Sequence, residues 1–142
     1  MIKNVYEILR EFELAETTEQ KKEVLKQNMS FHFKEVLRYT FNKNIEFYVE
    51  EKFPTDYVKP DTAPGIRYAG IESEIRRAYM FVKGDPTADS LSDEKRHILL
   101  LQLLESFEPE EALVWYNMMK KNLKVSGLTS ELILELYPEL FI

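Results

Sequence analysis

Three lysines close to a glycine are the first residues in this sequence whose spacing suggests chemistry. Lys120, Lys121 and Lys124 stand at i, i+1 and i+4, which is one side of a helix that continues through them. The residues that follow are small or polar and include Ser126, Gly127 and Thr129. A helix that begins after this glycine offers free N–H groups to an anion. The segment predicts a phosphate site; the alternative is a solvated basic surface at a helix end.

Two turns supply further basic residues. Lys43 and Asn44 follow one expected helix, and Lys83 and Gly84 end another. Exposed turns often carry binding residues, although most turn lysines are simply exposed. Arg76 and Arg77 either join them or pair with Glu72 and Glu74 on the same helix.

The composition excludes several kinds of site. The chain has no Cys and only two His, at positions 32 and 97, so a disulfide or a zinc site is not expected. Its carboxylates are not arranged beside a nucleophile or a metal-ligand set. We therefore expect a non-enzymatic protein without cofactor or metal. The absence of an apolar signal core or a membrane-length apolar run predicts a cytoplasmic protein with no membrane partner.

The charges are separated along the chain. The net charge is −6, whereas nucleic-acid binders are more often basic. Residues 84–111 contain eight acids and two bases, but residues 66–83 contain four bases and two acids. This separation permits one local basic face on an acidic protein.

Helical periodicity predicts how these residues are positioned. With 142 residues, 44% hydrophobic residues and few Gly and Pro, the chain predicts a single all-α domain, a bundle of about six to eight helices over residues 1–142. The expected helices cover residues 2–14, 19–27, 31–41, 71–82, 93–107, 109–123 and 130–136, with N-caps at Thr17-Thr18, Ser30, Ser92 and Thr129.

The remaining segments are less regular. Residues 45–49 form either a short helix, the interpretation we favour, or an extended strip. Residues 52–65 contain three Pro and no helical period, which predicts one long irregular loop. Trp115, Tyr116, Met118 and Met119 resemble interface residues, but a helix among core leucines is expected to bury them, and His32 is expected to pack or to cap.

Three stretches together resemble the N-terminal DNA-binding domain of the ATP-dependent DNA ligases of T-even-type phages and their bacterial relatives. They are residues 18–49, containing TEQKKEVLKQN, FKEVLRYTFN and IEFYV; residues 82–88, VKGDPTA; and residues 118–141, which end in YPEL before the final Phe. The resemblance covers most of the chain in the same order. There are two departures: Lys121-Asn122 replaces an arginine-aspartate pair, and one extra residue precedes Gly127.

The resemblance implies a helical domain that grips duplex DNA, intact or nicked, through backbone phosphates. It also implies that the turns at Lys43-Asn44 and Lys83-Gly84 contact the DNA backbone. This domain carries no catalysis, because the adenylation domain of such a ligase would follow this chain. The catalytic lysine of that domain lies in a lysine-x-aspartate-glycine motif. The nearest match is Lys83-Gly84-Asp85-Pro86, where proline replaces the glycine, and we interpret it as a chance match.

Two other roles are left open. The C-terminal end is acidic and apolar and finishes with Leu140, Phe141 and Ile142, and it resembles peptides that dock on sliding clamps. The alternative function is therefore a protein-interaction or structural adaptor that binds a clamp, a replisome component or a virion partner. The same segment otherwise packs on its own core. A third role is that of one half of a split ligase. The expected function is a replication-accessory, DNA-binding module of a bacteriophage.

Overall fold

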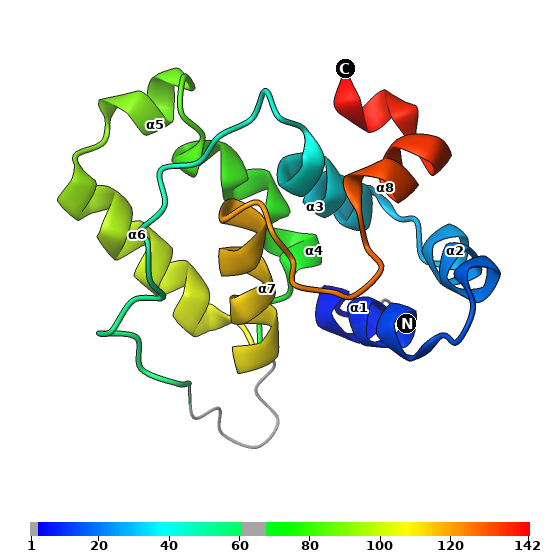
Figure 1. Ribbon diagram of the computed structural model, residues 1–142. Coiled ribbons are helices and arrows are strands. Elements are labelled where there is room, and N and C mark those ends of the chain that lie inside the picture. The colour runs from blue at the N-terminus through cyan, green and yellow to red at the C-terminus, as the bar shows by residue number, and fades with distance from the viewer. Residues whose placement is uncertain (1–2, 61–67) are drawn as a thin grey trace.

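Amphipathic helices arranged around a central apolar helix build this domain. The computed structural model describes residues 3–60 and 68–142 (Figure 1). Its helices are α1 (Val5–Leu14), α2 (Thr18–Gln27), α3 (Phe31–Phe41), α4 (Ile71–Glu74), η1 (Ile75–Phe81), α5 (Pro86–Ser90), α6 (Asp93–Ser106), α7 (Pro109–Met119), α8 (Ser130–Leu136) and η2 (Pro138–Phe141). The expected all-α bundle is confirmed.

Helix α7 lies at the centre of the core and contacts α1, α3 and α6. Trp115, Met118 and Met119 are buried, and the Trp115 ring lies 5.8 Å from that of Phe107. Tyr116 is also buried, and its hydroxyl donates to the Glu50 carbonyl. The prediction that these aromatic and Met residues belong to the core is therefore confirmed.

Local capping signals positioned several helices correctly. The side chains of Thr17, Ser30, Ser92 and Thr129 each accept a backbone N–H at the start of a helix. His32 is buried with a ring nitrogen 3.0 Å from the Ser30 hydroxyl, and burial lowers the pKa of this imidazole. The expected packing role of His32 is thus confirmed.

The segment 45–49 is extended and not helical, so the favoured interpretation of it was wrong. Phe47 forms an isolated antiparallel bridge with Val82, in which Tyr48 N donates to Phe81 O at 2.7 Å. Lys83 N donates to Glu46 O at 2.8 Å. These backbone hydrogen bonds to a distant segment replace the bonds that a helix would make, because buried N–H groups need partners.

Other boundaries also differ from the prediction. The first helix begins at Val5 and not at residue 2, which lies outside the described residues. The expected helix 71–82 tightens to a 3₁₀-helix from Ile75 onward. A short helix, α5, was not expected; it begins at Pro86 and is capped by the Asp85 side chain.

The irregular segment is partly described. Residues 52–60 contain no regular element, as expected, whereas residues 61–65 of the predicted loop lie outside the described ranges. No described helix combines the length and the apolarity that crossing a bilayer requires.

Candidate functional site

Four segments from three separate parts of the chain meet where α3 ends. These are the α3 end and its turn, the extended residues 45–49, the turn after η1, and the C-terminal end of α7. The bridge between Phe47 and Val82 joins the second and third segments, and the Lys121 ammonium joins the first and fourth. We call this place the α3 corner. The predicted site residues at the α3 corner are Lys43, Asn44, Lys83, Gly84, Lys120 and Lys121.

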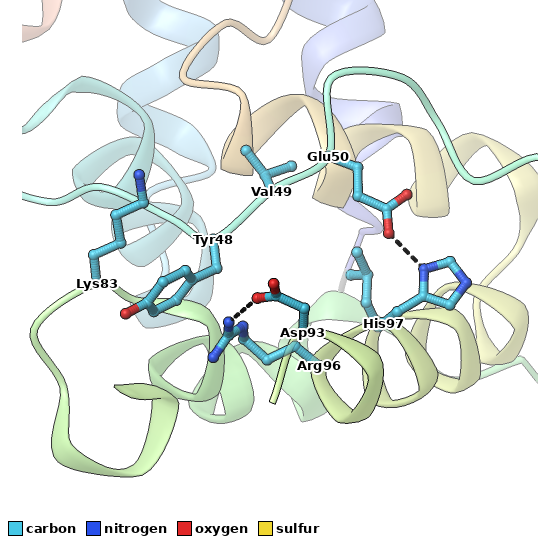
Figure 2. Close-up of a pocket in the computed structure, with 8 residues that line it drawn as sticks. Tyr48, Val49, Glu50, Lys83, Asp93, Arg96 and His97 are labelled. Carbon is cyan, nitrogen blue, oxygen red and sulfur yellow. Dashed lines mark hydrogen bonds and ion pairs between the residues drawn. The ribbon is translucent and has the colours of Figure 1, made fainter. Parts of the chain in front are cut away.

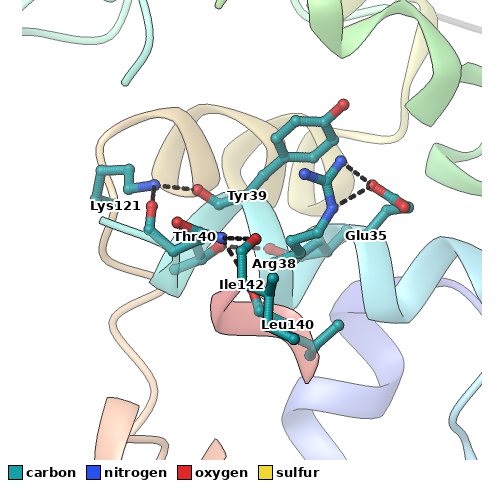
Figure 3. Close-up of polar contacts among 9 residues, drawn as sticks. Glu35, Arg38, Tyr39, Thr40, Lys121, Leu140 and Ile142 are labelled. Carbon is teal, nitrogen blue, oxygen red and sulfur yellow. Dashed lines mark hydrogen bonds and ion pairs between the residues drawn. The ribbon is translucent and has the colours of Figure 1, made fainter. Parts of the chain in front are cut away.

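Lys121 is the most constrained residue of the α3 corner. Its Nζ donates to the carbonyl oxygens of Tyr39 at 2.5 Å and Asn42 at 2.8 Å, which are among the last of α3 (Figure 3). The ammonium lies 6.0 Å from the centre of the Phe47 ring. A cation at this position opposes the negative end of the helix dipole, so Lys121 stabilises the C-terminus of α3.

The backbone of Lys121 adopts the left-handed conformation. Its φ is 64°, and Asn122 N donates to Asn117 O while Lys121 N donates to Met118 O. These two hydrogen bonds form a Schellman motif, in which Lys121 occupies the position that usually holds glycine. A non-glycine residue here costs on the order of 1–3 kcal/mol, so the side chain is held at a backbone position that does not favour it.

This end of α7 corrects the prediction for the three lysines. Helix α7 ends at Met119, Lys120 is its C-cap, and Lys124 also has a positive φ of 58°. Lys120, Lys121 and Lys124 therefore do not share one helical side, and that prediction was wrong. Lys120 Nζ donates to Glu51 O at 3.2 Å, which attaches it to the following loop.

The electrostatics of the α3 corner are mixed. Burial lowers the pKa of Lys121 to about 8; the carboxylate of Glu46 opposes this shift and the guanidinium of Arg38 adds to it. Lys43 and Lys83 are exposed, and the Lys83 ammonium lies 5.9 Å from the centre of the Tyr48 ring. Lys43 and Lys83 are thus the lysines of the α3 corner whose ammonium groups make no hydrogen bond or ion pair within the described ranges.

The other predicted residues lie away from the α3 corner. Lys124 lines a hollow of about 310 Å³ between α1 and α7, together with Tyr6, Leu9 and Arg10. A Cβ on Gly127, which has φ 84°, would lie 3.5 Å from Lys21 Cδ on α2 and 3.7 Å from Phe12 Cε1 on α1, so this glycine sits beside both helices. Ser126 is exposed in the same turn.

The N-terminus of α8, the helix that follows Gly127, is capped by the side chain of Thr129. Thr129 Oγ1 accepts the N–H of Leu132 at 3.2 Å, and α8 is only a short helix. The predicted phosphate site at residues 120–129 is therefore divided: Lys120 and Lys121 belong to the α3 corner, and Lys124, Ser126, Gly127 and Thr129 do not.

The C-terminal residues pack on the domain. Leu140 is buried, and Phe141 packs partly against the core. Asn42 Nδ2 donates to the carbonyls of Leu140 at 3.0 Å and Ile142 at 3.4 Å (Figure 3). Ile142 is 96% exposed. Of the three residues proposed to bind a partner, only Ile142 presents a free side chain.

A groove of about 370 Å³ opens beside the α3 corner, between residues 48–50 and α6 (Figure 2). The Arg96 guanidinium lies 3.9 Å from the centre of the Tyr48 ring and pairs with Asp93. It also donates to the carbonyls of Ala88 and Leu91, so it is already occupied in holding α5.

His97 holds the far end of this groove. Its Nδ1 lies 2.5 Å from Glu50 Oε1, and its Nε2 lies 2.8 Å from Asp56 Oδ2. The hydrogen bonds to Asp56 and Glu50 raise the pKa of the imidazole. Because the two carboxylates engage different ring nitrogens, the arrangement is an ionic clamp. Across residues 3–60 and 68–142, no three His, Asp or Glu side chains are grouped as a metal site requires.

Sequence reasoning missed three contacts, those of Arg76, His97 and Glu111. Arg77 pairs with Glu74 at 3.1 Å, as one alternative expected, but Arg76 stacks on Phe31 with 5.1 Å between the guanidinium carbon and the ring centre. The His97 clamp and the buried Glu111 also carried no local signal. All depend on contacts between distant segments, which spacing alone does not reveal.

Comparison with known proteins gives one family and one fold relationship. The model of a family of unknown function, DUF6433, matches residues 8–125. No curated protein matches the sequence. A solved chain titled "Pmar-Lig_PreS3" superposes with a TM-score of 0.68 at 18% identity, over 96% of this chain and 31% of that one. At that identity the match shows a shared fold, and this domain spans about a third of the solved chain.

Proposed function

We propose that this chain, which belongs to the family of unknown function DUF6433, is a non-catalytic module that binds duplex DNA through its phosphates. The observation that carries the proposal is the meeting of lysines from three segments at the α3 corner. Lys43 and Lys83 supply exposed ammonium groups there, and phosphate contacts by lysine need no sequence-specific geometry.

Two further observations support this role. The name of the solved chain that shares the fold contains "Lig", which agrees with the resemblance of this sequence to ligase N-terminal domains. Lys121 is kept at a left-handed position where glycine is favoured, and strain of this kind is typical of functional positions. The proposed contacts are Lys43, Asn44, Lys83 and Gly84, with Lys121 holding the end of α3 behind them.

The experiment measures the affinity of the full chain for a labelled DNA duplex, intact or nicked, over a range of salt concentrations. The double variant Lys43→Ala/Lys83→Ala is compared with Lys26→Ala/Lys95→Ala, which removes the same charge from exposed positions on α2 and α6. The slope of log K against log salt is expected to fall by about 2 in the first variant only, as when two phosphate contacts are lost. Absence of binding at low salt, or equal losses in both variants, would contradict the proposal.

A second candidate is a protein-interaction adaptor. The hollow between α1 and α7 favours it, because Leu113 on its wall is 50% exposed and the protein carries a net charge of −6. Leu113→Asp would abolish binding of such a partner while duplex affinity stays unchanged. Because Leu140 is buried, this hollow is a better docking surface than the C-terminal end.

A further inference from the structure

Two exposed aromatic rings and an arginine form a surface feature along the contact between α3 and η1. Phe31 is 56% exposed at the start of α3, and Tyr79 is 44% exposed on η1. The Arg76 guanidinium lies 5.1 Å from the centre of the Phe31 ring. We call Phe31, Arg76 and Tyr79 the stacking platform.

The 3₁₀ geometry of η1 brings the platform residues together. Residues i and i+3 eclipse one another on such a helix, so Arg76 and Tyr79 share one face, about 6 Å apart along the axis. Arg76 in turn reaches Phe31 on the neighbouring helix. The platform thus combines one observed stacking pair, Phe31 and Arg76, with a second exposed ring, Tyr79, on the same face of η1 as Arg76.

The charges around the platform are mixed, but two of the cations there, Arg76 and Lys34, make no ion pair within the described ranges. Within the described ranges Arg76 makes no ion pair, whereas Arg77 pairs with Glu74. Lys34 follows Phe31 by one helical turn, at i+3, and Arg38 lies at i+7 on the same stripe of α3. Arg38 stacks on the Tyr39 ring at 4.5 Å and pairs with Glu35 (Figure 3).

Single exposed apolar residues are common on proteins, but this combination is more specific. Each exposed ring presents a flat apolar surface, and the arginine that lies over Phe31 makes no ion pair with a described carboxylate. Nucleobases stack on aromatic rings and on guanidinium planes, and nearby cations neutralise the phosphates between the bases.

We propose that the stacking platform binds the unpaired bases of a single-stranded nucleic acid. Bases stack on Phe31 and Tyr79, with Arg76 between them, and Lys34 contacts the backbone. This site binds through aromatic rings, and the proposal goes beyond the duplex-binding role of the α3 corner. Either site functions without the other.

The test is fluorescence anisotropy of the full chain with a short labelled oligothymidylate at low salt. An abasic oligomer of the same length carries the same phosphates without bases. Phe31→Ala and Tyr79→Ala are each expected to weaken oligothymidylate binding roughly tenfold, the size typical of losing one stacked base. Tyr79→Phe keeps the ring and is expected to bind as the parent does.

The control variant is Leu134→Ala, which trims an exposed apolar side chain on α8, itself 49% exposed, and is expected to leave affinity unchanged. Thermal unfolding checks that each variant stays folded. Equal affinity for the abasic oligomer, no loss in Phe31→Ala, or no binding of oligothymidylate would each overturn the proposal. Base-dependent binding of single strands without any duplex binding would remove the α3 corner proposal and support this one.

Discussion

Two helix ends in this domain are closed by charged side chains from distant parts of the chain, with opposite charges. At the start of α1, the Glu111 carboxylate accepts the N–H of Val5 at 3.2 Å and of Tyr6 at 2.9 Å. At the end of α3, the Lys121 ammonium donates to the carbonyls of Tyr39 and Asn42. In both cases the sign of the charge opposes that of the helix end.

The two sites differ in their access to solvent. Glu111 is 1% exposed, whereas Lys121 is half-buried and lies at the α3 corner near Arg38. Burial shifts both pKa values toward the neutral form, to about 7 for Glu111 and to about 8 for Lys121. The comparison teaches that the same capping device works both sealed in the core, at Glu111, and at the border with solvent, at Lys121.

The largest expected effect concerns the pH dependence of Glu111. Its pKa rises from 4.5 to about 7, since burial outweighs the N–H bonds of Tyr6 and Val5. The native state then binds more protons than the unfolded state between these values, so stability falls as the pH rises from 4.5 to 7. Ionisation of Glu111 alone lowers the free energy of unfolding by about 3 kcal/mol over this pH range. The variant Glu111→Gln has no carboxyl group at this position and lacks this pH dependence.

Urea unfolding of both proteins across this pH range measures the effect as a difference, which cancels the titration of other groups such as His97. A difference that stays flat with pH would mean that the backbone N–H groups hold the carboxyl at its ordinary pKa. Burial would then shift the pKa of the capping group at Lys121 but not at Glu111, and the two capped helix ends would no longer be comparable.

The next prediction concerns the amine of Lys121. Lys121→Met keeps much of the side-chain volume but leaves the Tyr39 and Asn42 carbonyls without their donor, so we expect a loss of about 1–2 kcal/mol at neutral pH. The lysine is protonated less readily in the folded state than in the unfolded state. The stability of the parent relative to this variant should therefore rise as the pH increases from about 8 toward 10.5. Unfolding free energies at neutral and alkaline pH check both points, and a variant as stable as the parent would show that Lys121 does not cap α3.

Much of the fold was predictable because its signals are local. Thr17, Ser30 and Thr129 each mark a helix start that depends on only three neighbouring residues. The end of α7 was not predictable, because lysine and not glycine occupies the left-handed position after it. The expected helix at 45–49 failed for another reason: its backbone pairs with residues 81–83, which lie far away in the sequence.

The candidate site was predictable only in part. Turn chemistry correctly indicated that Lys43 and Lys83 are exposed, but not that a β-bridge brings their segments together. The contact of Glu111 with Val5 spans 106 positions, and that of Arg76 with Phe31 joins two helices. Charges whose partners lie on other elements give no periodic signal, so residue spacing could not reveal these contacts.

The smallest expected effect separates the backbone of Lys121 from its amine. Lys121→Gly and Lys121→Ala both lose the ammonium, but only glycine adopts a φ of 64° without steric cost, so Lys121→Gly should be more stable by about 1 kcal/mol. Lys120 is the control, since its φ is −78° and the same pair of substitutions there should favour alanine. Opposite signs at the two neighbouring positions would show that the left-handed backbone at Lys121 favours glycine, so that the contacts of the lysine amine with α3 must offset this steric cost. Equal stability of the two Lys121 variants would mean that the left-handed turn is not strained, and strain would then no longer distinguish Lys121 from Glu111.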